Sequence, residues 1–466
     1  MRGAALLAGV AVLLGASAVV IHPSAALGIA VGVAVLVFIL SNPLNATLAF
    51  IVVLIIRPAD HFPAVAVVHP AKVIGAIAIL SWLISRLVRG DLRLSRAPQV
   101  KWMAALGLAV LFSVLMSTNP DGSWQFFSEV FLKMLIVFAL LVHLVDTKTQ
   151  AVRLHLSLAF CTVALALYAV EMRVLGLATV EGNRAGLVGL LGDPNDLALA
   201  LLLPVPLFVE LILGSHGIRR FGWSIPLTVL VVGIFATVSR GGALGLLAVL
   251  GAVFYDRGGL GMRMLLGPAT VLVVVGLLLV AGVNERSSGS FESGHLDESA
   301  QGRLDMWQSG IRMAAHNPVF GVGVGQFPDN YQRYARNPVH WEPRDAHNSF
   351  TKAVAETGLL GFIPFMALVL LTLRTGYQYR KAEVPADTPA ERAVRRSLLP
   401  SMVGFCVAGF FLSQCWSWFL FILFAQGAAI HEVWKPEVED FWSRSRPADP
   451  AQSVTELGTV HAYLNE

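Results

Sequence analysis

Residues 196–213 read DLALALLLPVPLFVELIL, an apolar run of about the length that a helix needs to cross a bilayer. Similar runs recur along the whole chain of 466 residues, of which 56% are hydrophobic and only 14% charged. A soluble domain carries roughly 25% charged residues, and a disordered chain is far less apolar. The composition therefore predicts an all-α integral membrane protein with about 12–14 transmembrane helices.

The apolar runs place up to fourteen spans, of which 44–56, 241–254 and 399–412 are short for a straight crossing. The others lie at 4–21, 25–40, 71–86, 102–117, 130–144, 153–171, 196–213, 223–238, 264–283, 352–373 and 416–430. We expect a tight hairpin near Ser413–Cys415, because 399–430 is too long for one ordinary crossing. The first run resembles a cleavable signal peptide, but a second apolar run follows at once and favours an uncleaved first helix.

Lysine and arginine residues indicate the orientation of the spans, because they accumulate in inner loops. With the N-terminus inside, the inner segments carry 21 of these residues and the short outer segments carry 5. The basic excess, a net charge of +4, is spread thinly between apolar runs and so indicates membrane topology rather than a nucleic-acid partner. The predicted parts are N-terminal transmembrane helices over 1–283, a long outer loop over 284–351, C-terminal transmembrane helices over 352–430 and an inner polar tail over 431–466.

The long outer loop contains two segments with helical features. Residues 301–315 repeat apolar side chains at helical spacing and stop before Asn317 and Pro318, and residues 346–358 form a second helix that breaks near Gly358. Arg303 and Trp307 lie four residues apart on one face of the first helix. This spacing is compatible with a functional arginine and equally with a purely structural cation–π pair. The run Gly321–Gln326 is rich in glycine but does not follow a strand, so it predicts a turn rather than a nucleotide loop.

Polar residues also gather where other spans reach the outer side. Arg184 precedes Asp193, Asn195 and Asp196, which stand at the entrance to a helix and could cap it or bind a substrate. Arg240 lies between two spans, beside two glycines that permit a close approach of a ligand. An arginine at a membrane face usually has an anionic partner, which a headgroup, a carboxylate or a bound diphosphate would provide.

His347 lies where the long loop returns to the membrane, in the stretch DAHNSF. A neutral imidazole there could accept a proton from an attacking hydroxyl, since its unperturbed pKa is near 6.5. The alternative is a helix-capping cluster with an incidental histidine. The other loop histidines do not have zinc-ligand spacing, and the three cysteines lie in apolar runs as small packing residues, so no metal site or disulfide framework is predicted.

The stretch RDAHNSFTKAVAETGLLGF, residues 344–362, resembles the signature of the O-antigen ligase and O-antigen polymerase superfamily. Four upstream pieces agree in order. They are DPNDLA from Asp193, SRGG around Arg240, RLDMW at Arg303–Trp307 and NPVFGVGVGQF at Asn317–Phe327. The resemblance covers residues 180–362, with generic membrane helices before them.

This resemblance implies a metal-independent, inverting glycosyltransferase of the bacterial inner membrane, without a cofactor. Such proteins transfer a glycan from undecaprenyl diphosphate to an acceptor hydroxyl on the periplasmic side, so the loop 284–351 is expected to be periplasmic. Arg240 and Arg303 match the arginines thought to bind the diphosphate, and His347 matches the histidine thought to activate the acceptor. Substrate contacts are expected at Arg184, Asp193, Asn195 and Asn348. We predict that Arg240, Arg303 and His347 converge around one outward-facing cavity.

The resemblance leaves the acceptor open. The stretch IIRPADHFP, residues 55–63, is similar to exopolysaccharide and capsule polymerases, which favours the polymerisation of repeat units. The alternative is a ligase that attaches finished glycan to lipid A-core or to a protein hydroxyl. A transporter is a more distant alternative, because the sequence shows no internal repeat. Expected partners are the lipid-linked donor, the acceptor, the membrane, and flippase and chain-length regulator proteins.

Overall fold

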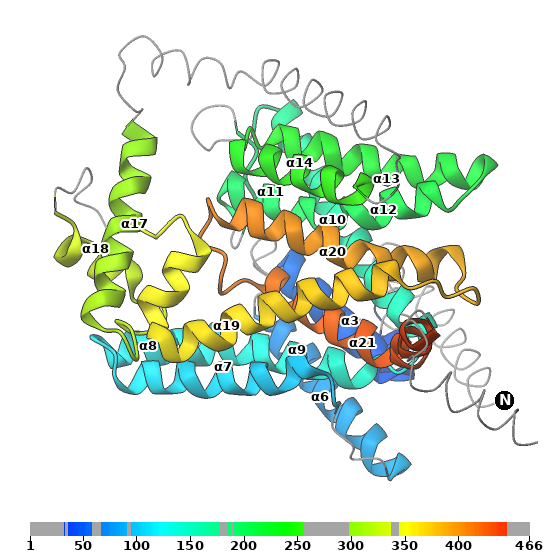
Figure 1. The fold of residues 1–466 in the computed structure, drawn as a ribbon, viewed down its shortest axis with the longest axis horizontal. Helices are drawn as coiled ribbons and strands as arrows, with labels where there is room; N and C mark the ends of the chain where they lie inside the picture. Colours follow the sequence, from blue (N-terminus) through cyan, green and yellow to red (C-terminus); the bar gives the residue numbers. More distant parts are fainter. Residues whose placement is uncertain are drawn as a thin grey trace, which may run out of the picture.

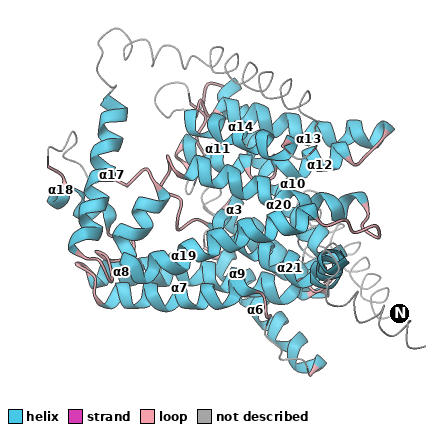
Figure 2. Ribbon diagram, in the orientation of Figure 1, coloured by secondary structure: helices cyan, strands magenta, loops and turns pink. Residues whose placement is uncertain are grey.

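A computed structural model describes residues 32, 36–57, 67–90, 95–177, 184–187, 191–255, 257, 298–336 and 344–444. The elements within these ranges are all helices (Figures 1 and 2). The predicted spans 4–21 and 264–283, most of 25–40, and most of the stretch 55–63 lie outside the described residues.

Seven helical segments of the described chain are long and apolar enough to cross a membrane. They are α6 (Pro70–Arg89), α7 (Pro98–Leu115), the run of α8 (Pro120–Phe126), η1 (Phe127–Phe131) and α9 (Leu132–Leu144), α10 (Lys148–Val174), the pair α11 (Pro194–Leu202) and α12 (Val205–Leu213), α13 (Gly217–Ala236) and α19 (Ser349–Lys381). Two shorter apolar helices are α3 (Pro43–Ile56) and α14 (Arg240–Phe254). The remaining helices are α17 (Glu298–His316), α18 (Phe327–Tyr334), α20 (Pro389–Gly409) and α21 (Trp418–Arg444). The prediction of an all-α integral membrane protein is confirmed, while the number of spans and the division into four parts stay predictions.

The helix α19 lies at the centre of the bundle. It packs along α7 on one side and α20 on the other, and α20 in turn packs on α14 and α12 (Figure 1). The chain between α20 and α21 forms a turn over residues 410–417, so the break predicted near Ser413–Cys415 is present. This turn, which we call the α20–α21 turn, lies beside the start of α19.

One predicted span is broken in the middle. The run 196–213 forms two helices, α11 and α12, separated at Leu203 and Pro204. Proline has no amide hydrogen and cannot continue the helical hydrogen bonds. The hydroxyl of Ser401 on α20 donates to the carbonyl of Leu203 at 2.7 Å, which satisfies one of the backbone acceptors at the break.

The predicted break of α19 falls at Gly358, where φ is 59° and ψ is −164°, a conformation essentially confined to glycine. The backbone there pairs with the segment after α17, since the Leu359 amide donates to the Pro318 carbonyl at 2.8 Å and the Val322 amide donates to the Ala355 carbonyl at 2.9 Å. The run Gly321–Gln326 is therefore a turn packed against this kink, as its sequence predicts.

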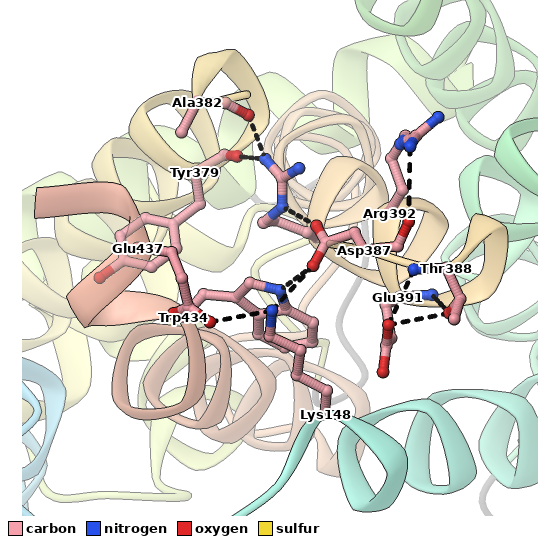
Figure 3. Close-up of polar contacts among 10 residues, drawn as sticks. Lys148, Tyr379, Ala382, Asp387, Thr388, Glu391, Arg392, Trp434 and Glu437 are labelled. Carbon is pink, nitrogen blue, oxygen red and sulfur yellow. Dashed lines mark hydrogen bonds and ion pairs between the residues drawn. The ribbon is translucent and has the colours of Figure 1, made fainter. Parts of the chain in front are cut away.

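A buried carboxylate joins several helices at the end of the bundle far from the α20–α21 turn (Figure 3). Asp387, between α19 and α20, accepts hydrogen bonds from Lys148 Nζ at 3.0 Å, Arg395 Nε at 2.9 Å and Trp434 Nε1 at 2.9 Å. The last of these lies in the predicted polar tail, whose first part here continues α21. These residues belong to segments that the charge count places on the inner side, so the bundle keeps predicted inner and outer residues at opposite ends.

Candidate functional site

Two helices begin side by side at the predicted outer end of the bundle and are joined through Asn195. Asp193 is the N-cap of α11 and accepts from the Asn195 amide at 2.7 Å, as its capping interpretation predicts. Ser239 is the N-cap of α14 and donates from its hydroxyl to Asn195 Oδ1 at 2.8 Å. Arg184 Nη2 donates to the same oxygen at 2.9 Å. These contacts hold the two helix N-termini together and place Arg240, the first residue of α14, beside them.

A third helix, α19, begins at the same end. Its N-cap Asn348 is buried and accepts from the amides of Phe350 and Thr351, each at 2.9 Å. The hydroxyl of Ser349 donates to the Leu412 carbonyl at 2.6 Å, which ties this helix start to the α20–α21 turn. Three helix N-termini with partial positive charge thus lie around one end of the bundle.

His347 precedes this third cap in an unusual backbone conformation. Its φ is 45°, in the left-handed region that a non-glycine residue enters at a cost of order 1–3 kcal/mol. The surrounding structure holds it there: the His347 amide donates to Ser413 Oγ at 2.8 Å, and its carbonyl accepts from Trp307 Nε1 at 3.3 Å. Val238, immediately before the cap of α14, is also left-handed with φ at 50°. Strained residues of this kind cluster at functional sites.

Aromatic side chains connect α17 to the turn. The Trp307 ring packs edge-on against Phe410, with centroids 5.1 Å apart, and lies 6.4 Å from the ring of Phe411. A Cβ atom at Gly241 would lie 3.7 Å from Cβ of Phe411, so the start of α14 contacts the same turn. Arg303 lies one helical turn before Trp307 on α17. The elements that carry Arg303, Arg240 and His347 are therefore in contact with one another. That their side chains share one outward-facing cavity stays a prediction.

The electrostatic environment of His347 favours its neutral form. Burial and the positive charge of Arg303 lower the pKa of the imidazole below its ordinary value of 6.5, and Arg344 acts in the same direction. The carboxylates of Asp345 and Asp193 oppose this shift. The imidazole is therefore neutral at pH 7 and available to accept a proton.

A chain of charged side chains next to His347, which runs from the half-buried Asp345 to the buried Glu356, is not evident from the sequence. Lys352 Nζ forms an ion pair with Asp345 at 2.6 Å and lies 3.9 Å from the fully buried carboxylate of Glu356. That carboxylate accepts from Trp416 Nε1 at 2.7 Å and from the Gly325 amide at 2.9 Å. The chain thus ties the turn around His347 to the glycine turn and to the α20–α21 turn. The signal for it was a lysine and a glutamate four residues apart in the stretch that carries His347.

Four residues were predicted to contact substrate. Arg184 is buried and its Nε donates to the Thr237 carbonyl at 3.1 Å, so its observed contacts brace the strained segment before α14. Asp193 and Asn348 cap helices, and Asn195 joins α11 to α14. Each thereby has a structural role at the site, and direct contact with a substrate stays a prediction for all four.

The described residues include no group of three or more histidine, cysteine, aspartate or glutamate side chains that could hold a metal ion. The three cysteines are free, as expected for packing residues. His316 ends α17 with its Nδ1 2.8 Å from the Arg312 carbonyl, while His295 and His340 lie outside the described residues.

The fold and the site define a multi-pass membrane protein. The elements that carry Arg240, Arg303 and His347 lie at the end of the bundle where three helices begin, an arrangement that attracts an anionic group. Residues 225–366, from within α13 to within α19, match a family model described as O-antigen ligase. This match confirms the resemblance to the O-antigen ligase and polymerase superfamily. The family implies a glycosyltransferase-like membrane enzyme with lipid-linked glycan and acceptor substrates. No curated protein matches the chain.

Proposed function

We propose that this protein transfers a glycan from undecaprenyl diphosphate to an acceptor hydroxyl on the periplasmic side of the inner membrane. The observation that carries the proposal is His347 held in a strained turn beside the start of α19, where burial and the charge of Arg303 lower the pKa of its imidazole. The family match over residues 225–366 supports the same reaction class.

In the proposed reaction the His347 imidazole takes the proton from the acceptor hydroxyl. The acceptor oxygen then forms a bond to the anomeric carbon of the donor sugar while the bond between that carbon and the diphosphate oxygen breaks. Attack from the face opposite the leaving group inverts the configuration at the anomeric carbon. The lowered pKa of His347 suits this role, since a base must be unprotonated at the working pH.

The leaving diphosphate gains negative charge as its bond to the sugar breaks. Arg240, exposed at the N-terminus of α14, and Arg303 on α17 would stabilise this charge through bidentate hydrogen bonds, which guanidinium groups make better than ammonium groups. The N-termini of α11, α14 and α19 add partial positive charge in the same direction. Because these groups supply the positive charge that the reaction needs, we propose that it proceeds without a divalent metal.

We propose further that the acceptor is a second lipid-linked repeat unit, so that the protein is a polymerase of an O-antigen, capsule or exopolysaccharide. The alternative is a ligase, which the description of the matching family model favours. The experiment measures the length of the glycan left on the lipid carrier in a deletion strain that is complemented with wild type, His347→Ala or His316→Ala. His316→Ala is the control, because this histidine is exposed at the end of α17.

Single repeat units that accumulate with the His347→Ala variant, but not with the His316→Ala variant, would support a polymerase. Long polymer retained on the carrier would support the ligase instead. If neither species accumulates at normal protein levels, the transferase proposal is wrong.

A further inference from the structure

A cavity lies within the helix bundle, away from the candidate site. It is lined by α3, α10, α11, α12, α20 and α21 together with the break at Leu203 and Pro204. The cavity is partly open, and its volume, taken as the space open to the centre of a water molecule, is about 60 Å³. One water needs only about 10–15 Å³ by this measure, so the cavity admits a group of several heavy atoms. Most of its wall is apolar, with side chains such as Ile55, Leu158 and Phe419, which suits hydrocarbon.

One polar side chain of the wall, His155, has a hydrogen-bond partner for only one of its two ring nitrogens. His155 is only 5% exposed, and its Nδ1 lies 2.8 Å from the Ala151 carbonyl. A carbonyl only accepts hydrogen bonds, so Nδ1 carries the proton in the neutral imidazole and Nε2 is an acceptor. Nε2 is buried and has no partner within the described chain. A buried acceptor of this kind destabilises the fold while it stays unsatisfied.

A second polar side chain borders this cavity without a hydrogen-bond partner among the described residues. The side chain of Gln426 on α21 also lines it and forms no hydrogen bond with the described residues. By contrast, the hydroxyls of Thr162 and Ser401 in the wall already donate to backbone carbonyls. The cavity thus combines an apolar wall with one unsatisfied acceptor, His155 Nε2, and one side-chain amide, that of Gln426.

We infer that this cavity binds the head of a neutral lipid alcohol, a long apolar chain that carries one hydroxyl group. The hydroxyl hydrogen is donated to His155 Nε2, and the hydroxyl oxygen accepts from the Gln426 amide. A hydroxyl is favoured over an ammonium group because none of the described residues that line the cavity is acidic. The hydrocarbon chain packs on the apolar wall and leaves through the open side. This site is separate from the proposed transfer reaction and does not depend on it.

The experiment uses the full-length protein in phosphatidylcholine nanodiscs with a photoreactive hexadecanol that carries a diazirine on its chain. The matched probe is its methyl ether, which has the same chain but no hydroxyl hydrogen. After irradiation, mass spectrometry locates the labelled peptides. We expect labelling of the α10 and α21 segments that line the cavity, about fivefold stronger for the alcohol than for the ether, as one net hydrogen bond gives. Excess unlabelled hexadecanol should compete.

Two variants test the polar groups separately. Gln426→Leu removes the amide without filling the space, and His155→Gln keeps a hydrogen-bond acceptor whereas His155→Phe removes it. We expect Gln426→Leu and His155→Phe to lower the labelling severalfold and His155→Gln to retain most of it. The control Gln125→Leu, at an exposed position on α8, should leave it unchanged. Equal labelling by alcohol and ether, or no labelling of the cavity segments, would mean that only water or unspecific chains enter and would overturn the inference.

Discussion

Replacement of Gly358 by alanine tests how the histidine-bearing start of α19 is attached to the bundle. At this position φ is 59° and ψ is −164°, and a Cβ atom would lie 2.4 Å from the carbonyl carbon of Val319. The residue must therefore leave its conformation, at a strain of about 1–3 kcal/mol. The hydrogen bonds from the amides of Leu359 and Leu360 to the segment after α17 would break as well, each with a net contribution of about 1 kcal/mol. We expect a total loss of about 3–5 kcal/mol in the free energy of unfolding.

The assay is a titration of the purified protein in mixed micelles with a denaturing detergent, followed by circular dichroism and by tryptophan fluorescence. Gly251→Ala is the matched control, because this glycine lies inside α14 and a Cβ atom there would have no contact within 4 Å from another element of the described residues. Alanine at this position should be neutral or stabilise by up to about 1 kcal/mol. If Gly358→Ala unfolds at the same detergent fraction as wild type, the kink is not the constrained junction described above.

Four further predictions concern the site and the bundle. The transfer rate should fall at acid pH with a midpoint below pH 6.5, because the pKa of His347 is lowered and its neutral form is the base. Asp345→Asn removes a charge that raises this pKa, so this midpoint should move to lower pH in a pH–rate profile. Asp387→Ala should destabilise the bundle by about 3–5 kcal/mol because it leaves buried cations unpaired, whereas Asp440→Ala, in an exposed ion pair, should cost at most about 0.5 kcal/mol in the same detergent titration. Ser413→Ala removes the acceptor of the His347 amide and should lower kcat more than it raises KM; an equal effect on folding yield and kcat would point to a purely structural role. Turnover should persist in EDTA, and a loss that magnesium or zinc restores would contradict metal independence.

The helices of the described part follow closely from the apolar runs, because a bilayer requires long apolar helices and their ends coincide with proline, glycine and charged residues. The kink at Gly358 was predictable, because glycine is a poor helix former and here stands directly before an apolar run. The break at Pro204 was not predicted, because a proline inside an apolar run can also sit in a kinked continuous helix. The break is stabilised by Ser401, which lies far away in the sequence and donates a hydrogen bond to the Leu203 carbonyl.

The candidate site was predictable only in its motif residues. His347 and Arg240 stand out as polar groups at the ends of apolar runs, and Arg303 stands out on the predicted helix of the long loop. The roles of Ser413 and Glu356 depend on contacts between segments far apart in the sequence, which periodicity and spacing do not carry. The left-handed backbone of His347 is likewise fixed by such contacts rather than by its own residue type.

The most direct test of the central proposal is single-turnover transfer by the purified protein in nanodiscs, with a lipid-linked donor and an acceptor glycan. Wild type and His347→Ala are compared with His316→Ala at saturating acceptor. The account predicts a fall of about 10²–10⁴-fold in the rate for His347→Ala, as expected for loss of a general base, and little change for His316→Ala. A His347→Ala variant that folds normally and transfers at the wild-type rate would contradict it.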